Sequence, residues 1–247
     1  MPDHETALAL GLRRLTSEGS RRVFLRLAGM LGGAVAVTSL VGCGDDDDDG
    51  TGPSGGGIAL DFARPVDVLK YAFALEALEA DFYTRVVANA SFSTTFASAA
   101  ERTMLTDIRD HEVAHREFLR AAVTAAGGTL PSLTTAYPGV DFSSRTSVLA
   151  TAKVFEDTGV AAYNGAGKYL VSRTDLLTIA GKIVSVEARH ASAIRDTISP
   201  NTDQFANVTG LTGANEANGL DAKATPQQVL AAVDAFVNQS FSVTGTT

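Results

Sequence analysis

The sequence predicts an all-α protein built around a four-helix bundle, and three observations predict this fold class. The chain of 247 residues is rich in alanine and contains no tryptophan, a composition that favours helices over sheets. Apolar residues recur at helical spacing in four long segments. The first and third joins between these segments are short and the second is long, which is typical of a bundle with one crossover connection.

The predicted bundle occupies residues 65–199. Pro65 suits the first turn of a helix, Gly127 and Gly128 end the second helix, and Pro200 stops the fourth. Residues 128–144 form the predicted crossover because prolines and glycines interrupt them. The predicted helices cover residues 66–89, 95–126, 145–171 and 175–198.

The last segment, residues 200–247, is predicted to be a loop followed by one short helix. Residues 225–228 (Thr-Pro-Gln-Gln) match a capping box with proline at the first helical position. The extra C-terminal helix is therefore expected to run from there to about residue 238.

Residues 1–43 resemble an export signal. Residues 20–25 (Ser-Arg-Arg-Val-Phe-Leu) resemble a twin-arginine motif, and the apolar run that follows is short for a membrane-spanning helix. The run ends in residues 40–43 (Leu-Val-Gly-Cys), which resemble a bacterial lipoprotein cleavage site. Cys43 is thus the predicted lipidation site, and we expect a periplasmic or extracytoplasmic protein that is lipid-anchored to a membrane. A plain signal peptide and an uncleaved anchor helix are the alternatives.

Residues 44–64 are predicted to be a flexible tether, because an acidic run and a Gly/Ser/Pro stretch cannot bury a core. The formal net charge of the whole chain is −8. Residues 1–42 contain five of the 20 basic and three of the 28 acidic residues, so the rest carries about −10. This charge argues against a nucleic-acid partner, since phosphate binding needs a basic patch. Cys43 is the only cysteine, which excludes an intrachain disulfide.

Two Glu-x-x-His motifs are the strongest chemical signal in the chain. Glu112 precedes His115 by three residues, and Glu187 precedes His190 by the same distance. Three residues are just under one helical turn, so each pair lies on one helix face and can meet one metal centre.

The other two long helices carry matching carboxylates. Glu76 lies seven residues before Tyr83, and Glu156 lies seven residues before Tyr163. Seven residues are two helical turns, so each glutamate shares a face with its tyrosine. Glu79 competes with Glu76 as the ligand of the first helix, although the tyrosine spacing favours Glu76.

Residues 66–198 resemble the ferritin-like superfamily, whose di-metal members use one glutamate from each of two helices and a Glu-x-x-His motif from each of the other two. The first helix is also similar to that of exported bacterial ferritin-like proteins, a group that includes desiccation-related proteins. The resemblance implies that Glu76 and His115 bind one metal ion, that Glu156 and His190 bind the other, and that two glutamates bridge them. The six implied ligands are Glu76, Glu112, His115, Glu156, Glu187 and His190.

The resemblance further implies two iron ions, or manganese or mixed metals, and dioxygen or peroxide as reaction partners. We therefore expect a di-iron oxidoreductase that protects the cell envelope. Tyr83 and Tyr163 are the candidate catalytic residues, as hydrogen-bond partners of ligands or as redox-active groups, and the alternative is that they are aromatic core residues. A desiccation-related structural bundle without turnover is the alternative function. A homodimer is possible. Ligating imidazoles usually donate their second N–H, and the candidate acceptors are Asp110, Asp157 and Asp196.

His111, Glu112 and His115 also match the His-Glu-x-x-His pattern of zinc peptidases. This third interpretation leaves Glu187 and His190 unexplained. His111 is expected to be a flanking or surface residue.

Overall fold

The computed structural model describes residues 57–211 and 213–246 of the chain. The predicted signal peptide, the lipidation site at Cys43 and the acidic part of the tether lie outside the described residues. Within the described part of the chain, every helix is too short or too polar to cross a membrane.

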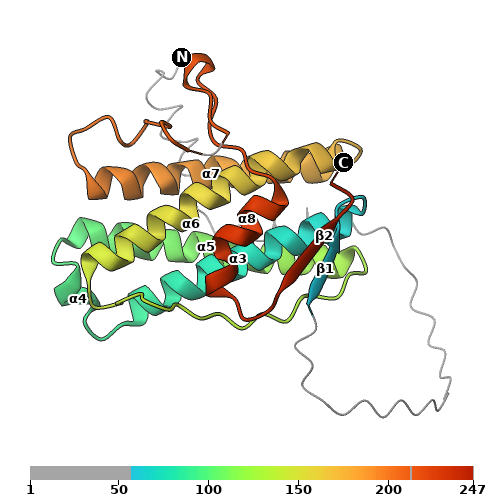
Figure 1. The fold of residues 1–247 in the computed structure, drawn as a ribbon. Coiled ribbons are helices and arrows are strands. Elements are labelled where there is room, and N and C mark those ends of the chain that lie inside the picture. Colours follow the sequence, from blue (N-terminus) through green and yellow to red (C-terminus); the bar gives the residue numbers. More distant parts are fainter. Residues whose placement is uncertain (1–56, 212, 247) are drawn as a thin grey trace, which may run out of the picture. The chain divides into compact units, whose positions relative to one another are not determined.

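Four long helices form the bundle, as the sequence predicted (Figure 1). They are α3 (Pro65–Ala88), α5 (Ala99–Ala125), α6 (Arg145–Ala166) and α7 (Thr174–Ile198). The shorter elements are α4 (Phe92–Thr95), α8 (Pro226–Val233) and three 3-10 turns, η1 (Gly167–Leu170), η2 (Glu216–Asn218) and η3 (Asp234–Phe236). The predicted all-α class is therefore confirmed.

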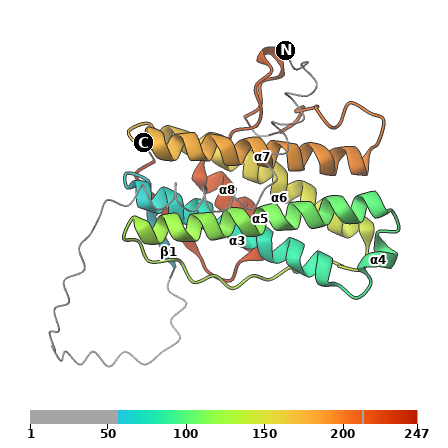
Figure 2. The same cartoon turned by 180° about the vertical axis from the view of Figure 1, so that it is seen from behind.

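The bundle consists of two helical hairpins that bury their apolar faces against each other. The helix α3 packs mainly on α5, and α6 packs mainly on α7. Seen from behind, α5 runs alongside α3 with α7 as its other neighbour (Figure 2). Phe82 of α3 meets Phe155 of α6 edge to face, with ring centroids 5.1 Å apart, and both side chains are fully buried. Aromatic pairs of this kind add to the stabilisation that comes from burial of apolar surface.

Two helix ends differ from the prediction for identifiable reasons. The helix α5 begins at Ala99 rather than near residue 95, because the Ser98 side chain accepts a hydrogen bond from the Glu101 amide and caps the helix there. The third predicted helix stops being α-helical at Ala166 and continues as η1. Tightened 3-10 turns are common at helix ends.

Two short parallel strands, β1 (Ile58–Asp61) and β2 (Phe241–Thr244), were not predicted. The prediction of a flexible tether up to residue 64 is wrong for residues 58–62, because Leu60 in β1 and Phe62 just after it are each only 1% exposed. The pairing joins residues 183 positions apart, such as Ile58 and Phe241. A local sequence pattern carries no signal for such a partner.

The C-terminal segment is fixed to α6. The Ala224 amide donates to the Ala161 carbonyl at 3.0 Å, and the Asn164 side chain donates to the Ala222 carbonyl at 2.8 Å. A Cβ atom at Gly165 would lie 1.7 Å from the Ala224 carbonyl oxygen, so only glycine permits this approach. The helix α8 follows and lies across α6 (Figure 1). It ends at Val233 and continues as η3, and is thus shorter than predicted.

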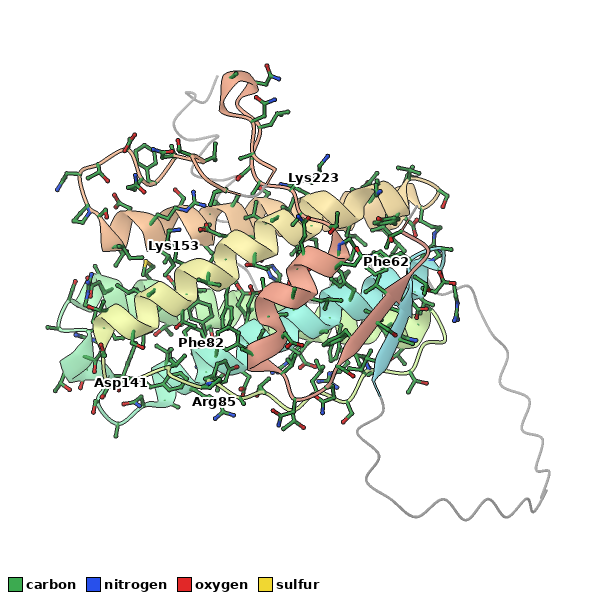
Figure 3. The ribbon with its side chains drawn as sticks, viewed as in Figure 1. Phe62, Phe82, Arg85, Asp141, Lys153 and Lys223 are labelled. Atoms are coloured by element: carbon green, nitrogen blue, oxygen red, sulfur yellow. The ribbon has the colours of Figure 1, made fainter. Side chains whose placement is uncertain are left out.

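The crossover between α5 and α6 is held against α3 by one carboxylate. Asp81 accepts hydrogen bonds from Thr135 at 2.7 Å and from Tyr137 at 2.9 Å. Arg85 donates to the same carboxylate from the next turn of α3. Phe82 points into the bundle, whereas Arg85 lies at its rim (Figure 3). The crossover therefore covers the bundle on the α3 side, and its partly buried Tyr137 and Phe142 pack against Phe82 of the core.

Candidate metal centre

Each of the four long helices places one glutamate in the centre of the bundle. All four side chains are completely inaccessible to solvent, which is rare for glutamate unless it is paired or bound to a cation. They are Glu76 on α3, Glu112 on α5, Glu156 on α6 and Glu187 on α7.

Two histidines complete the cluster. His115 follows Glu112 on α5, and its side chain is 14% exposed. His190 follows Glu187 on α7 and is 5% exposed. Each histidine therefore turns inward on the same helix face as the glutamate one turn before it, as the three-residue spacing requires.

One group of ligand atoms surrounds His115. Its Nδ1 atom lies 3.2 Å from Oε2 of Glu76, 3.5 Å from Oε2 of Glu112 and 3.1 Å from Oε1 of Glu187. These four residues offer one ligand atom each, and all four atoms lie within 4.8 Å of one another. We call this group the His115 half.

The second group surrounds His190. Its Nδ1 atom lies 2.7 Å from Oε1 of Glu112 and 3.4 Å from Oε2 of Glu156. With Glu187, these residues again offer four ligand atoms within 4.8 Å of one another. We call this group the His190 half. Glu112 and Glu187 belong to both halves, and the two oxygens of Glu112 face different histidines.

The two predicted tyrosines lie in the same cluster and reach across the bundle. Tyr83 of α3 donates a 2.5 Å hydrogen bond to Oε1 of Glu156 on α6. Tyr163 of α6 donates a 2.5 Å hydrogen bond to Oε1 of Glu76 on α3. Each tyrosine therefore supports the glutamate of the opposite hairpin rather than the one on its own helix.

The remaining polar atoms of the cluster form no well-oriented hydrogen bond among the described residues, although the histidine nitrogens lie 2.7–3.5 Å from carboxylate oxygens. Eight buried atoms are in this position: Oε2 of Glu76, both carboxylate oxygens of Glu112, Nδ1 of His115, Oε2 of Glu156, both carboxylate oxygens of Glu187 and Nδ1 of His190. Native proteins rarely leave buried polar groups unpaired. Carboxylate oxygens with imidazole nitrogens are a donor set that suits divalent iron or manganese. The residues present therefore fit a pair of such ions.

Burial and the neighbouring charges shift the pKa values of the cluster strongly when no metal is bound. Burial, reinforced by repulsion from Glu112, raises the pKa of Glu187 well above its usual range and that of Glu76 to about 7. Burial also opposes ionisation of Glu112, but the close approach of both histidine rings outweighs it and lowers the pKa of Glu112 to about 2. Burial disfavours a charged His115 or His190, yet the surrounding carboxylates raise the pKa of His115 to about 12 and that of His190 to about 10.

Glu79, the alternative to Glu76, lies three residues further along α3 and is also buried. It is 4% exposed, and burial and repulsion from Glu187 raise its pKa well above the usual range. It is not a member of either half. A Cβ atom at Gly159 would lie 3.3 Å from Oε1 of Glu79 and 3.3 Å from Oε2 of Glu187, so this glycine leaves the space that the two carboxylates occupy.

The residue that supports His190 was missed by the sequence prediction. None of the three candidate aspartates orients a histidine: Asp157 pairs with Lys153 and Arg195, Asp110 pairs with Arg109, and the described histidines contact glutamates or one another rather than Asp196. His111 takes this place, with its Nδ1 atom 2.9 Å from Nε2 of His190. His111 is exposed, as predicted for a surface residue, but its ring contacts that of His190. Its position one residue before Glu112 gave no signal that it crosses to α7.

The geometry does not assemble the zinc-peptidase pattern. His111 faces His190, whereas the ligand atom of His115 faces three glutamates. Neither half of the cluster includes His111. The two histidines of the pattern therefore do not converge on one position, and Glu112 lies among the ligand atoms instead of beside them.

Comparison with known proteins gives one finding. Residues 64–200, more than half of the chain, match the family model described as a ferritin-like domain. A search of curated proteins returned no match.

Proposed function

Because the chain belongs to the ferritin-like domain family, we propose that its bundle holds two iron ions and oxidises them with dioxygen or peroxide. The observation that carries this proposal is the convergence of eight buried ligand atoms from four glutamates and two histidines, none of which forms a well-oriented hydrogen bond. The family match supports the fold and the general type of site. The metal, its number and the reaction are our inference from the residues.

The distances support different ligand roles for the six side chains. Glu76 and His115 would hold one ion, and Glu156 and His190 would hold the other. Glu112 would bridge the two ions, because its two oxygens face different histidines. Glu187 would form the second bridge, since it takes part in both halves.

The charge balance also supports two divalent ions. Four ionised glutamates in a buried site would repel one another strongly, and the cost of removing each from water is several kcal/mol or more. Two divalent cations neutralise four carboxylates, and neutral histidines leave that balance unchanged. A single ion would leave two of the four charges uncompensated.

Two bound ferrous ions would supply two electrons, which together with two protons would reduce one peroxide to two waters or one dioxygen to peroxide. The bundle provides the surroundings for this chemistry. Tyr83 and Tyr163 hold Glu156 and Glu76 in place through 2.5 Å hydrogen bonds. A single glutamate carboxylate separates each tyrosine hydroxyl from the proposed ions, which makes the two tyrosines candidates for redox-active groups.

Oxygen or peroxide consumption tests this function. The full chain would be loaded anaerobically with ferrous ions and mixed with either oxidant, while iron oxidation is followed by absorbance. We expect oxidation at the site that is fast compared with free iron and is lost in the Glu112→Ala/His190→Ala double variant. Metal bound without turnover would contradict the oxidase proposal and support a structural, desiccation-related bundle.

We further propose that the chain is exported and lipid-anchored through Cys43. The twin-arginine-like residues 20–25 and the lipoprotein-like residues 40–43 support this proposal. Fractionation of cells that express the full chain tests it. The wild type should be in the membrane fraction, and Cys43→Ala should move it to another fraction. Equal distributions of both proteins would contradict lipid anchoring.

A further inference from the structure

His111 occupies a position that the proposed metal centre does not use. It lies one residue before the bridging candidate Glu112 on α5, and its ring reaches across to α7. The rings of His111 and His190 are nearly parallel, with an interplanar angle of 11° and centroids 5.2 Å apart. The hydrogen bond between them, from Nδ1 to Nε2, measures 2.9 Å.

The geometry determines how protons are arranged in this pair when a metal is bound. Nδ1 of His190 faces Glu112 and Glu156, so it is the nitrogen available to a metal ion. A neutral imidazole that binds metal through Nδ1 carries its proton on Nε2. Nε2 of His190 therefore donates, and Nδ1 of His111 accepts.

The other half of the cluster lacks this arrangement. The chain repeats itself weakly, and Glu187 in the second hairpin corresponds to Glu112 in the first. The residue before Glu187 is Val186, whose aliphatic side chain has no acceptor. His115 therefore has no imidazole at the position that corresponds to His111. The two halves share their bridging glutamates, but only the His190 half has a second imidazole, that of His111, beside its histidine.

His111 and Val186 line one surface groove between α5 and α7. The groove has a volume of about 550 Å³, and its lining includes His111, Val186 and His190. His111 is exposed, so its substitution creates no cavity in the core. The groove thus makes both positions accessible to substitutions that leave the four-helix core intact.

We propose that His111 is a positioning residue that fixes the tautomer and ring plane of His190 and thereby makes the His190 half bind metal more tightly than the His115 half. This inference rests on the proposed two-metal centre. Loss of an outer hydrogen-bond partner of a metal-binding histidine typically lowers metal affinity about 10- to 100-fold. Metal ions would accordingly fill the centre in order, with the His190 half first.

Cobaltous ion is a suitable probe, because its absorption reports its coordination and it does not need oxygen to be detected. Metal-free full chain would be titrated with it at equilibrium. We expect two binding steps in the wild type and a tighter step that weakens about 10- to 100-fold in His111→Phe. His111→Gln, whose amide oxygen can accept the same hydrogen bond, should recover part of the loss. Val186→Ala lines the same groove and should leave both steps unchanged.

Single-site backgrounds assign the effect to one half. In a His115→Ala background, His111→Phe should weaken the remaining tight site by the same factor. In a His190→Ala background, it should change nothing. Equal affinities for wild type and His111→Phe would overturn this inference while leaving the two-metal centre intact. Absence of cobalt binding by the wild type would instead overturn the proposed function, and circular dichroism confirms that each variant is folded.

Discussion

The Tyr83 hydroxyl donates a 2.5 Å hydrogen bond to Oε1 of Glu156, which links α3 to α6 inside the core. Tyr163 and Glu76 form the equivalent link in the other direction, from α6 to α3. In both carboxylates the other oxygen has no hydrogen-bond partner among the described residues. Each glutamate is therefore held by a tyrosine on one side and offers its free oxygen to the centre of the cluster on the other.

Tyr83→Phe should destabilise the protein. The substitution keeps the ring but removes the donor, so Oε1 of Glu156 loses its buried partner. Hydrogen bonds to charged groups contribute about 2 kcal/mol, and we expect a loss of that size in the free energy of unfolding. Urea denaturation measures it. Tyr169→Phe is the matched control, because its hydroxyl makes a longer, 3.2 Å bond to a backbone carbonyl and should cost less. Equal losses in the two variants would contradict the assigned role.

Gly159→Ala should weaken metal binding. The new methyl group would lie 3.3 Å from carboxylate oxygens of Glu79 and Glu187, which is closer than carbon and oxygen atoms normally approach. Displacement of Glu187 by a few tenths of an ångström should lower metal affinity by about tenfold, the lower end of the effect seen when support of a ligand is lost. Gly181→Ala on α7 is the control, since nothing lies within 4 Å of its Cβ position. An unchanged affinity in Gly159→Ala would contradict this prediction.

The metal-free protein should lose stability as pH rises from about 5 to 9. The pKa of Glu76 is raised to about 7, so the folded protein keeps a proton that the unfolded chain releases near pH 4.5. The pKa values of His190 and His115 are raised to about 10 and about 12, whereas the unfolded chain releases those protons near pH 6.5. The stability contributed by each group is present below its unfolded pKa and is lost as pH rises toward its folded pKa.

Thermal unfolding at several pH values, with a chelator present, measures this dependence. We expect the melting temperature of the metal-free protein to fall across the range and that of the metal-loaded protein to fall less, because metal replaces the bound protons. A metal-free protein whose stability increases with pH would contradict the proton count in the cluster.

Asp157→Ala should destabilise the fold without changing the metal content. Asp157 accepts from the Arg195 guanidinium, which is 7% exposed and also donates to the Asn207 carbonyl at 3.0 Å. Removal of one partner leaves the other charge buried and unpaired, which costs about 3 kcal/mol. Lys153→Ala is the control, because this lysine contacts Asp157 from a more exposed position. A variant with wild-type stability and reduced metal content would instead assign Asp157 to the site.

The sequence was sufficient to predict the bundle and the residues that meet inside it. The Glu-x-x-His spacing places Glu112 with His115 on one face of a helix, because helical geometry is local and periodic. The seven-residue spacing does the same for Glu76 and Tyr83. The spacing predicted only that each glutamate shares a helix face with its tyrosine, and in the structure the hydrogen bonds cross to the other hairpin. A shared face does not determine which neighbour a side chain meets.

Non-local relationships were out of reach of the sequence. The pairing of β1 with β2 depends on contacts between the two ends of the domain. The space that Gly159 leaves for two carboxylates depends on how α6 faces α3 and α7. The contact of His111 with His190 depends on the distance between α5 and α7. Each needs the packed bundle, and no periodicity within one helix encodes it.

Iron content per chain tests the two-metal centre most directly. The full chain and the Glu112→Ala/His190→Ala variant would be loaded with ferrous ions without oxygen, freed of unbound metal and analysed by elemental mass spectrometry. We expect about two irons per wild-type chain and none in the variant, because the variant removes one bridge and one terminal ligand. Absence of bound metal in the wild type, or equal metal in both proteins, would contradict the two-metal centre.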